Sequence, residues 1–281
     1  RMTGLTNEEI AIRPEWAMHV SYPEGESGLG EFARANLSAE EQARVGAAGS
    51  SRAAALREFF GRVKRYGLAR RANADVPLDA KLEAAIPYAL GERPVVFAAN
   101  GRRAIEGAVA LAKELGLKAV IEGGKEAWKV VDLLKKEDVP VILPLPVWAQ
   151  PGAAGQVAPL SPFDPYDAWW ATPALLNRAG VRFAFASGAS ENTYNLPMRA
   201  GQACAWGLPK AAALKALTTG AAGILGLDDL GSVAPGKRAT FFLSSGDPLE
   251  IATTVKLMMI DGRPVSLENH WTNLYEKYRD R

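Results

Sequence analysis

The feature that most constrains the fold is a regular alternation of apolar runs and helix-like runs between Arg93 and Pro146. Short apolar runs cover residues 94–98, 118–121 and 140–143, and a segment with helical periodicity separates each run from the next. Such alternation is typical of β-α-β units on a parallel sheet. The runs show almost no polar alternation, which is expected for strands that are buried on both faces.

Further elements are predicted on both sides of this stretch. Residues 1–37 have the composition of a mostly irregular segment, and Ser38, followed by Glu41, has the spacing of a helix-capping box. The other elements expected outside the stretch are helices at about 53–66, 80–90, 164–176, 196–206 and 209–219, and a fourth strand at 181–186.

The sequence pattern changes at Gly231. Turn-like segments and short apolar runs then alternate, with strands expected at 239–243 and 255–260. The second run ends at Asp261-Gly262, a dipeptide that strongly indicates a hairpin turn. We therefore expect a small antiparallel β unit here, followed by a polar tail with aromatic residues.

Composition narrows the functional classes. The net charge is +2, with 33 basic and 31 acidic residues intermixed, which argues against nucleic acid as a partner. Cys204 is the only cysteine, and His19 and His270 are the only histidines, so a site that needs three histidines is excluded. No apolar run reaches the length of a membrane span. The compartment stays open between cytoplasm and export.

Parallel sheets bind ligands at the carboxyl ends of their strands. The candidate pocket residues that follow the predicted strands are Asn100, Glu122, Lys125, Ser187 and Glu191. Glu122 fits either a ligand or acid role or a solvated, ion-paired strand end. A nucleophilic Ser187 is disfavoured, because His19 falls in a predicted loop and His270 in the tail, which leaves no base for it.

The order of four short motifs carries a family resemblance. These motifs are residues 216–227 (ALTTGAAGILGL), 231–237 (GSVAPGK), 246–249 (GDPL) and 260–262 (IDG). In this order they resemble the C-terminal half of an amidohydrolase-superfamily protein of the imidazolonepropionase-like type, over about residues 93–266. The resemblance implies a (β/α)8 TIM-like barrel beside a small β-sandwich that is built from both chain ends.

The resemblance divides the chain and predicts partners. The expected parts are an upstream barrel segment with inserted helices (1–92), the second half of the barrel (93–228), a share of the composite sandwich (229–266) and a tail (267–281). A complete barrel has eight strands, whereas four are predicted. We therefore expect atypical strands in residues 1–90, a missing N-terminal segment, or a homologous amidohydrolase chain in an oligomer to complete the sheet.

The metal site is where the sequence departs from the family pattern. Family members hydrolyse C–N bonds with one or two divalent ions, usually zinc, which activate water. The resemblance implies a His, a His and an Asp as ligands at positions that hold Ala98, Gly123 and Gly188 here, and the family's His-x-His pair has no counterpart. We expect no bound metal, no cofactor and no catalytic residue at these positions.

Two functions remain compatible with the sequence. The first is a catalytically degenerate amidohydrolase-like protein that acts as a binding or structural subunit. The alternative is an active hydrolase of cyclic amide or peptide-like C–N bonds, with metal ligands outside this segment or with metal-free chemistry. The barrel fold hosts many activities and does not decide between them.

Overall fold

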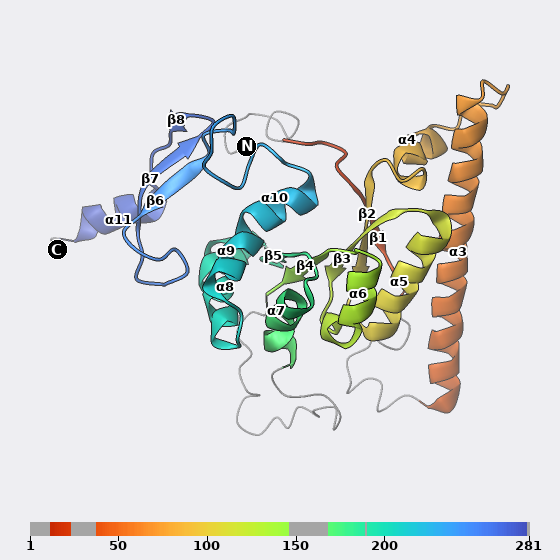
Figure 1. Ribbon diagram of the computed structural model, residues 1–281, viewed down its shortest axis with the longest axis horizontal. Coiled ribbons are helices and arrows are strands. Elements are labelled where there is room, and N and C mark those ends of the chain that lie inside the picture. The colour runs from red at the N-terminus through yellow and green to blue at the C-terminus, as the bar shows by residue number, and fades with distance from the viewer. Residues whose placement is uncertain (1–11, 24–37, 146–167, 189, 280–281) are drawn as a thin grey trace.

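The computed structural model describes residues 12–23, 38–145, 168–188 and 190–279, and within them a five-stranded parallel sheet of order β1-β2-β3-β4-β5 (Figure 1). Each strand hydrogen-bonds in parallel to the next along the chain. The strands are β1 (Met18–Ser21), β2 (Pro94–Ala99), β3 (Lys118–Gly123), β4 (Val141–Pro144) and β5 (Phe183–Ala186). The four predicted strands are confirmed, and together they form part of a TIM-like barrel.

Strand β1 was not predicted, and it lies within residues 1–37, a segment that we expected to be mostly irregular. Met18 pairs with Val95, and Ser21 pairs with Ala98. The sequence Met-His-Val-Ser alternates apolar and polar residues, and its burial alternates in the same way. Such a short, half-buried strand lacks the continuous apolar run of the other strands, and for that reason it was missed. It supplies an outer neighbour of β2 and corresponds to one of the three expected alternatives, an atypical strand in residues 1–90.

The sheet is open within the described part of the chain. There, β1 pairs only with β2, and β5 pairs only with β4. A closed barrel has no such edges, because its first and last strands pair with each other.

The long helix α3 (Ala39–Arg71) extends well beyond the predicted range of 53–66. Its first half is rich in Ala, Arg and Glu but has no apolar stripe. The apolar periodicity of the sequence therefore predicts only the second half of the helix, which packs against the rest of the domain. The capping box is confirmed: the Ser38 hydroxyl accepts the Glu41 N–H, and the Glu41 carboxylate accepts the Ser38 N–H. Helix α4 (Ala80–Ala89) follows, with Asp79 as its N-cap.

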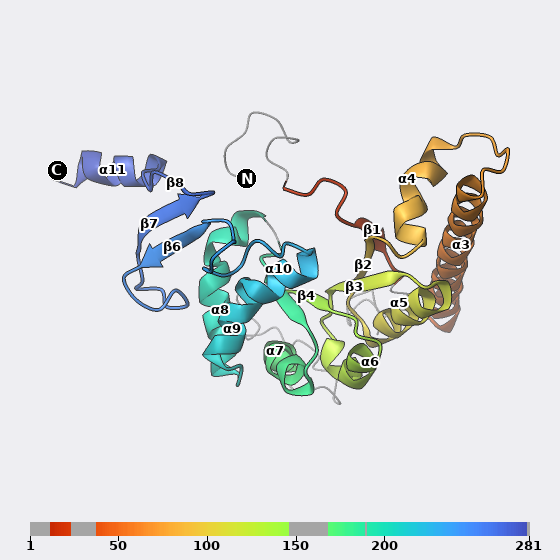
Figure 2. The same cartoon turned by 45° about the horizontal axis from the view of Figure 1, so that its top comes forward.

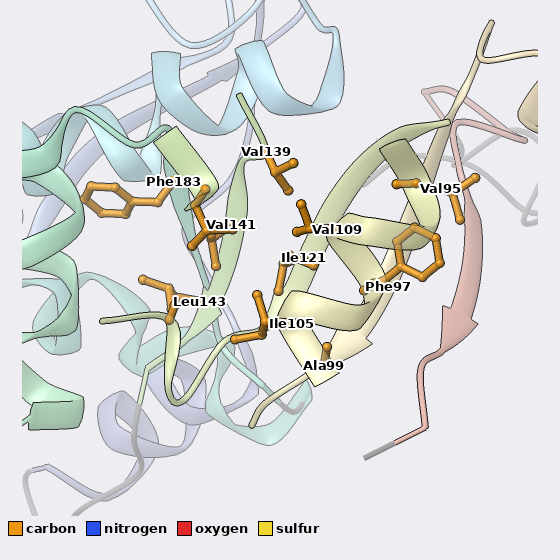
Figure 3. Packing of buried hydrophobic residues seen from close by; sticks show 14 of the residues in the cluster. Val95, Phe97, Ala99, Ile105, Val109, Ile121, Val139, Val141, Leu143 and Phe183 are labelled. Atoms are coloured by element: carbon orange, nitrogen blue, oxygen red, sulfur yellow. The ribbon is translucent and has the colours of Figure 1, made fainter. Parts of the chain in front are cut away.

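One face of the sheet is covered by the helices that connect the strands or follow the last strand (Figure 2). They are α5 (Arg102–Leu115), α6 (Val131–Lys136) after the 3-10 turn η2 (Ala127–Val130), α7 (Ala168–Ala179), α8 (Leu196–Ala205) after the 3-10 turn η3 (Ser190–Asn195), and α9 (Lys210–Leu217). The main core lies between this face and the helices, where Val95, Phe97 and Ile121 meet Ile105 and Val109 (Figure 3).

The opposite face has a smaller core near the start of the strands. Val96, Val120 and Ala184 pack there against Ile224 of α10 (Thr219–Leu225). The predicted helix at 209–219 corresponds to α9, whereas α10 was not predicted and is separated from α9 by the non-helical backbone of Thr218 (φ −126°, ψ −101°). Toward the carboxyl ends of the strands, this face carries partly exposed side chains such as Glu122.

The second sheet is antiparallel and consists of β6 (Phe241–Ser244), β7 (Val255–Ile260) and β8 (Arg263–Pro264). The predicted hairpin is confirmed, with positive φ at both Asp261 (51°) and Gly262 (76°), as a type I′ turn requires. Helix α11 (His270–Tyr278) ends the described chain. Among the described helices, none combines the length and apolar character needed to cross a membrane.

Candidate functional site

The carboxyl ends of all five parallel strands meet along one edge of the sheet. In register, Ala98 lies level with Ser21 on one side and with Glu122 on the other. Further along the sheet, Pro144 lies level with Ala186. This is the edge where a parallel α/β sheet places its ligands, so the strand ends are the first place to look for chemistry.

Asn100 holds two neighbouring strand ends together. Its backbone carbonyl accepts the N–H of Glu126 at 2.9 Å, and the carbonyl of Ala99 accepts the N–H of Gly124 at 2.8 Å. The side chain of Glu126 in turn accepts the N–H of Arg102, the first residue of α5, at 2.6 Å. These contacts fix the geometry of the loops that follow β2 and β3.

Lys125 lies at the surface beyond β3. Its ammonium is 5.3 Å from the centre of the Trp169 ring at the start of α7, which is within the range of a cation–π interaction. Lys125 therefore links the loop after β3 to the helix before β5, and Trp169 contributes an aromatic face at the same edge.

Ser187 follows β5. Its hydroxyl lies 3.5 Å from the hydroxyl of Thr193, and its carbonyl faces the guanidinium of Arg199 at 3.4 Å. Glu191 belongs to η3, and its side chain lies outside the described residues. The structure thus brings the other four predicted residues to the same edge without showing direct contacts between their side chains.

Glu122 has a partner that the sequence did not indicate. Its Oε2 lies 3.4 Å from Nδ1 of His19, and the exposed fractions of the two side chains are 44% and 62% respectively. The expectation that His19 lies in a distant loop is therefore wrong, because β1 carries it to the same face as Glu122. The polar residue at 19 between two apolar neighbours was the signal for a half-buried strand.

The strand ends also hold a phenol. Tyr22 follows β1, where its N–H donates to the carbonyl of Ala98, and its ring contacts Phe97 edge-on. Burial raises the pKa of Tyr22, and the nearby Arg57 opposes this shift. Tyr22 is therefore a neutral hydroxyl at physiological pH.

The three positions that correspond to family metal ligands do not fit a metal. Ala98 and Gly123 end neighbouring strands, and Gly188 follows the end of β5; none has a side-chain donor atom. Within the described residues, no three His, Cys, Asp or Glu side chains come together in a way that could hold a metal ion. The donor set of a zinc site, three or four N, O or S ligands, is thus not formed by these strand ends.

Comparisons with known proteins support the fold. The amidohydrolase family model matches residues 169–265. The crystal structure of an amidohydrolase from Thermotoga maritima MSB8 is similar with a TM-score of 0.74 and 24% identity, covering 95% of this chain and 66% of that one. An uncharacterized protein of known structure gives a TM-score of 0.50 and 22% identity, covering 66% of this chain and 48% of that one. A comparison with curated proteins found no match.

The chain spans about two thirds of the length of the Thermotoga structure and about half of the second one. At these identities the likeness to the solved structures concerns the fold, whereas the family model adds a match in sequence. The match of residues 169–265 to the amidohydrolase family model and the shared fold both agree with the resemblance of the motifs to the amidohydrolase superfamily.

Proposed function

We propose that this protein is a catalytically degenerate member of the superfamily, which binds a ligand or another chain at the strand ends instead of hydrolysing a C–N bond on a metal. The observation that carries the proposal is the backbone at Gly123. Its φ is +104°, and a Cβ built there would lie 2.6 Å from Oδ1 of Asn100. A ligand side chain is therefore not merely missing: any side chain at this position would strain the backbone and require the Asn100 side chain to move.

Of the other two positions, only Gly188 supports the same conclusion, and it does so less strongly. Gly188 has a φ of +76°, and a Cβ there would meet Cβ of Pro144 at 3.3 Å. Ala98 lies in a regular strand and would accept a larger side chain. One available position out of three cannot supply the three or more protein donors that a catalytic zinc ion requires.

A role as a subunit is supported by the surfaces that the described residues leave open. The edges of β1 and β5 expose backbone groups that would pair with further strands. On the second sheet, Phe242 is 47% exposed and Leu243 is 54% exposed. Both features suit a composite assembly in which another segment or a second chain completes the sheets. Native mass spectrometry of the intact protein tests whether it forms an oligomer. A strictly monomeric protein whose own strands close the barrel would contradict an oligomer.

The experiment for the degenerate site is a zinc titration. Isothermal calorimetry on the intact protein, after treatment with a chelator, is expected to show no site tighter than micromolar at the strand ends. Glu122→Gln is the informative variant, because Glu122 is the one carboxylate among the described strand ends with a histidine beside it. A tight zinc site that disappears in Glu122→Gln would overturn the proposal.

One observation favours an alternative, metal-independent hydrolase. His19 and Glu122 form an imidazole–carboxylate pair, and a carboxylate that orients an imidazole is the arrangement of a general base. If the pair is catalytic, hydrolysis of cyclic or peptide-like amides should fall by at least about a hundredfold in His19→Gln. If the protein only binds a ligand or another chain, neither the wild type nor His19→Gln should hydrolyse these amides.

A further inference from the structure

The most unusual side chain in the described part of the molecule is Arg199, on α8 beside the end of β5. It is 2% exposed and is the largest fully buried side chain. Its Nη1 faces the carbonyl of Ser187 at 3.4 Å, which is long for a hydrogen bond, and its Nη2 is buried with no partner. No carboxylate lies within ion-pair distance of it among the described residues.

Three other arginines show the opposite arrangement. Arg57, Arg102 and Arg182 are each about half exposed, and each is paired with a carboxylate. Arg182 makes a two-pronged contact with Asp138, with distances of 3.1 Å and 3.0 Å. These three arginines are paired with carboxylates although water already solvates them, whereas Arg199 has no counter-charge among the described residues.

This arrangement is costly unless something completes it. A guanidinium has five N–H donors and stays protonated in proteins, so Arg199 cannot escape the penalty by losing its charge. A buried charge without a partner is destabilising, and buried charges in proteins are generally paired. The location adds the second argument, because Ser187 lies at the carboxyl end of β5, the edge where parallel sheets bind ligands.

We infer that Arg199 is the anion-binding residue of this site and that its ligand is the carboxylate group of a small organic acid. A planar guanidinium matches a carboxylate through two parallel hydrogen bonds. A single guanidinium balances one negative charge, which favours a monocarboxylate over a phosphate dianion. This inference deepens the proposed binding role, and it rests on that role only in placing the ligand at the carboxyl ends of the strands. The two proposals are tested separately: the zinc titration tests the absence of a metal site, and an anion titration tests whether Arg199 binds a carboxylate.

The test is a titration of the intact protein with sodium propionate, in which sodium chloride keeps the ionic strength constant and serves as the control salt. The melting temperature is measured at each propionate concentration. The wild type is expected to show a saturable rise with propionate and no rise with chloride, and phosphate is expected to act more weakly than propionate. In Arg199→Met the saturable response should be lost, while the melting temperature without propionate should equal or exceed that of the wild type, because an uncompensated charge has been removed.

Two further variants keep the result interpretable. Arg182→Met is the matched control, because it removes an arginine at the other end of β5 that already has its carboxylate. It should keep the propionate response and change the melting temperature only slightly, since an exposed ion pair contributes little to stability. Arg199→Lys keeps the charge without the planar fork and should weaken propionate binding by about tenfold.

Three outcomes would overturn the inference. The first is equal behaviour of propionate and chloride on the wild type, which requires no variant. The second is a propionate response that persists in Arg199→Met. The third is a melting temperature of Arg199→Met well below that of Arg182→Met, since this would mean that a carboxylate of the protein itself already pairs with Arg199.

Discussion

Nδ1 of His19 lies 3.4 Å from Oε2 of Glu122, although one strand separates β1 from β3. On that strand, Val96 lies level with His19 and Ala98 lies level with Glu122, so the imidazole and the carboxylate meet diagonally across β2. The register of β1 therefore decides which side chain faces Glu122.

The His19–Glu122 pair is expected to contribute little to stability. Both side chains are well exposed, at 62% and 44%, and exposed ion pairs contribute about 0–1 kcal/mol. A double-mutant cycle with His19→Gln and Glu122→Gln in urea unfolding measures the coupling. A coupling energy well above about 1 kcal/mol would show that the pair is a structural element of the sheet instead of a feature of its binding edge.

Gly123→His is expected to destabilise the protein without creating a metal site. A non-glycine residue at φ +104° is strained by about 1–3 kcal/mol, and its Cβ would lie 2.6 Å from Oδ1 of Asn100. Ala98→His is the matched control, since it introduces the same side chain on a regular strand and should change the free energy of unfolding much less. Equal stability of the two variants in urea would show that Gly123 tolerates a ligand side chain.

Leu249 is expected to anchor the second sheet to the barrel. It lies between β6 and β7 but is only 3% exposed within the main core, and its carbonyl would lie 2.5 Å from a Cβ at Gly201 of α8. Leu249→Ala should cost about 2–5 kcal/mol in the free energy of unfolding. Ile251→Ala is the control, because Ile251 is 83% exposed, and its substitution should stay within about 0.5 kcal/mol.

Asp247, in the same segment between β6 and β7, should make the stability of the protein depend on pH in the acidic range. A hydrogen bond from Lys210, followed by one from the N–H of Leu249, lowers the pKa of Asp247. Its stabilising contribution is therefore present above the ordinary pKa of an aspartate and is lost as the pH falls through the lowered value. Asp247→Asn should melt below the wild type at pH 7, and the difference should shrink below about pH 4. A difference that is constant from pH 7 to pH 2 would contradict this.

The fold could be predicted largely from continuous apolar runs. Residues 94–98, 118–121 and 140–143 are strands because parallel strands with both faces buried leave a strong pattern, and Asp261-Gly262 forms the turn that its backbone preference requires. The strand at 18–21 could not be found in this way, since one of its faces is exposed. The first half of α3 was missed because it has no apolar face to give a period.

The site was less predictable, for a physical reason. Strand ends can be placed from the chain order, and this gave Asn100, Glu122 and Ser187. The pairing of His19 with Glu122 depends on the register of a strand that periodicity did not reveal. Arg199 could not be recognised from sequence at all, because an arginine in a helix is usually exposed, and only packing shows that this one is buried with its Nη2 unpaired.

The central claim is that the strand ends of this protein do not hold a catalytic metal. Elemental analysis of the intact, unmodified protein tests it most directly. The account predicts no stoichiometric zinc, iron or manganese and no amidase activity that a chelator abolishes. Stoichiometric metal that a chelator removes together with an amidase activity, both restored when the metal is added back, would contradict it.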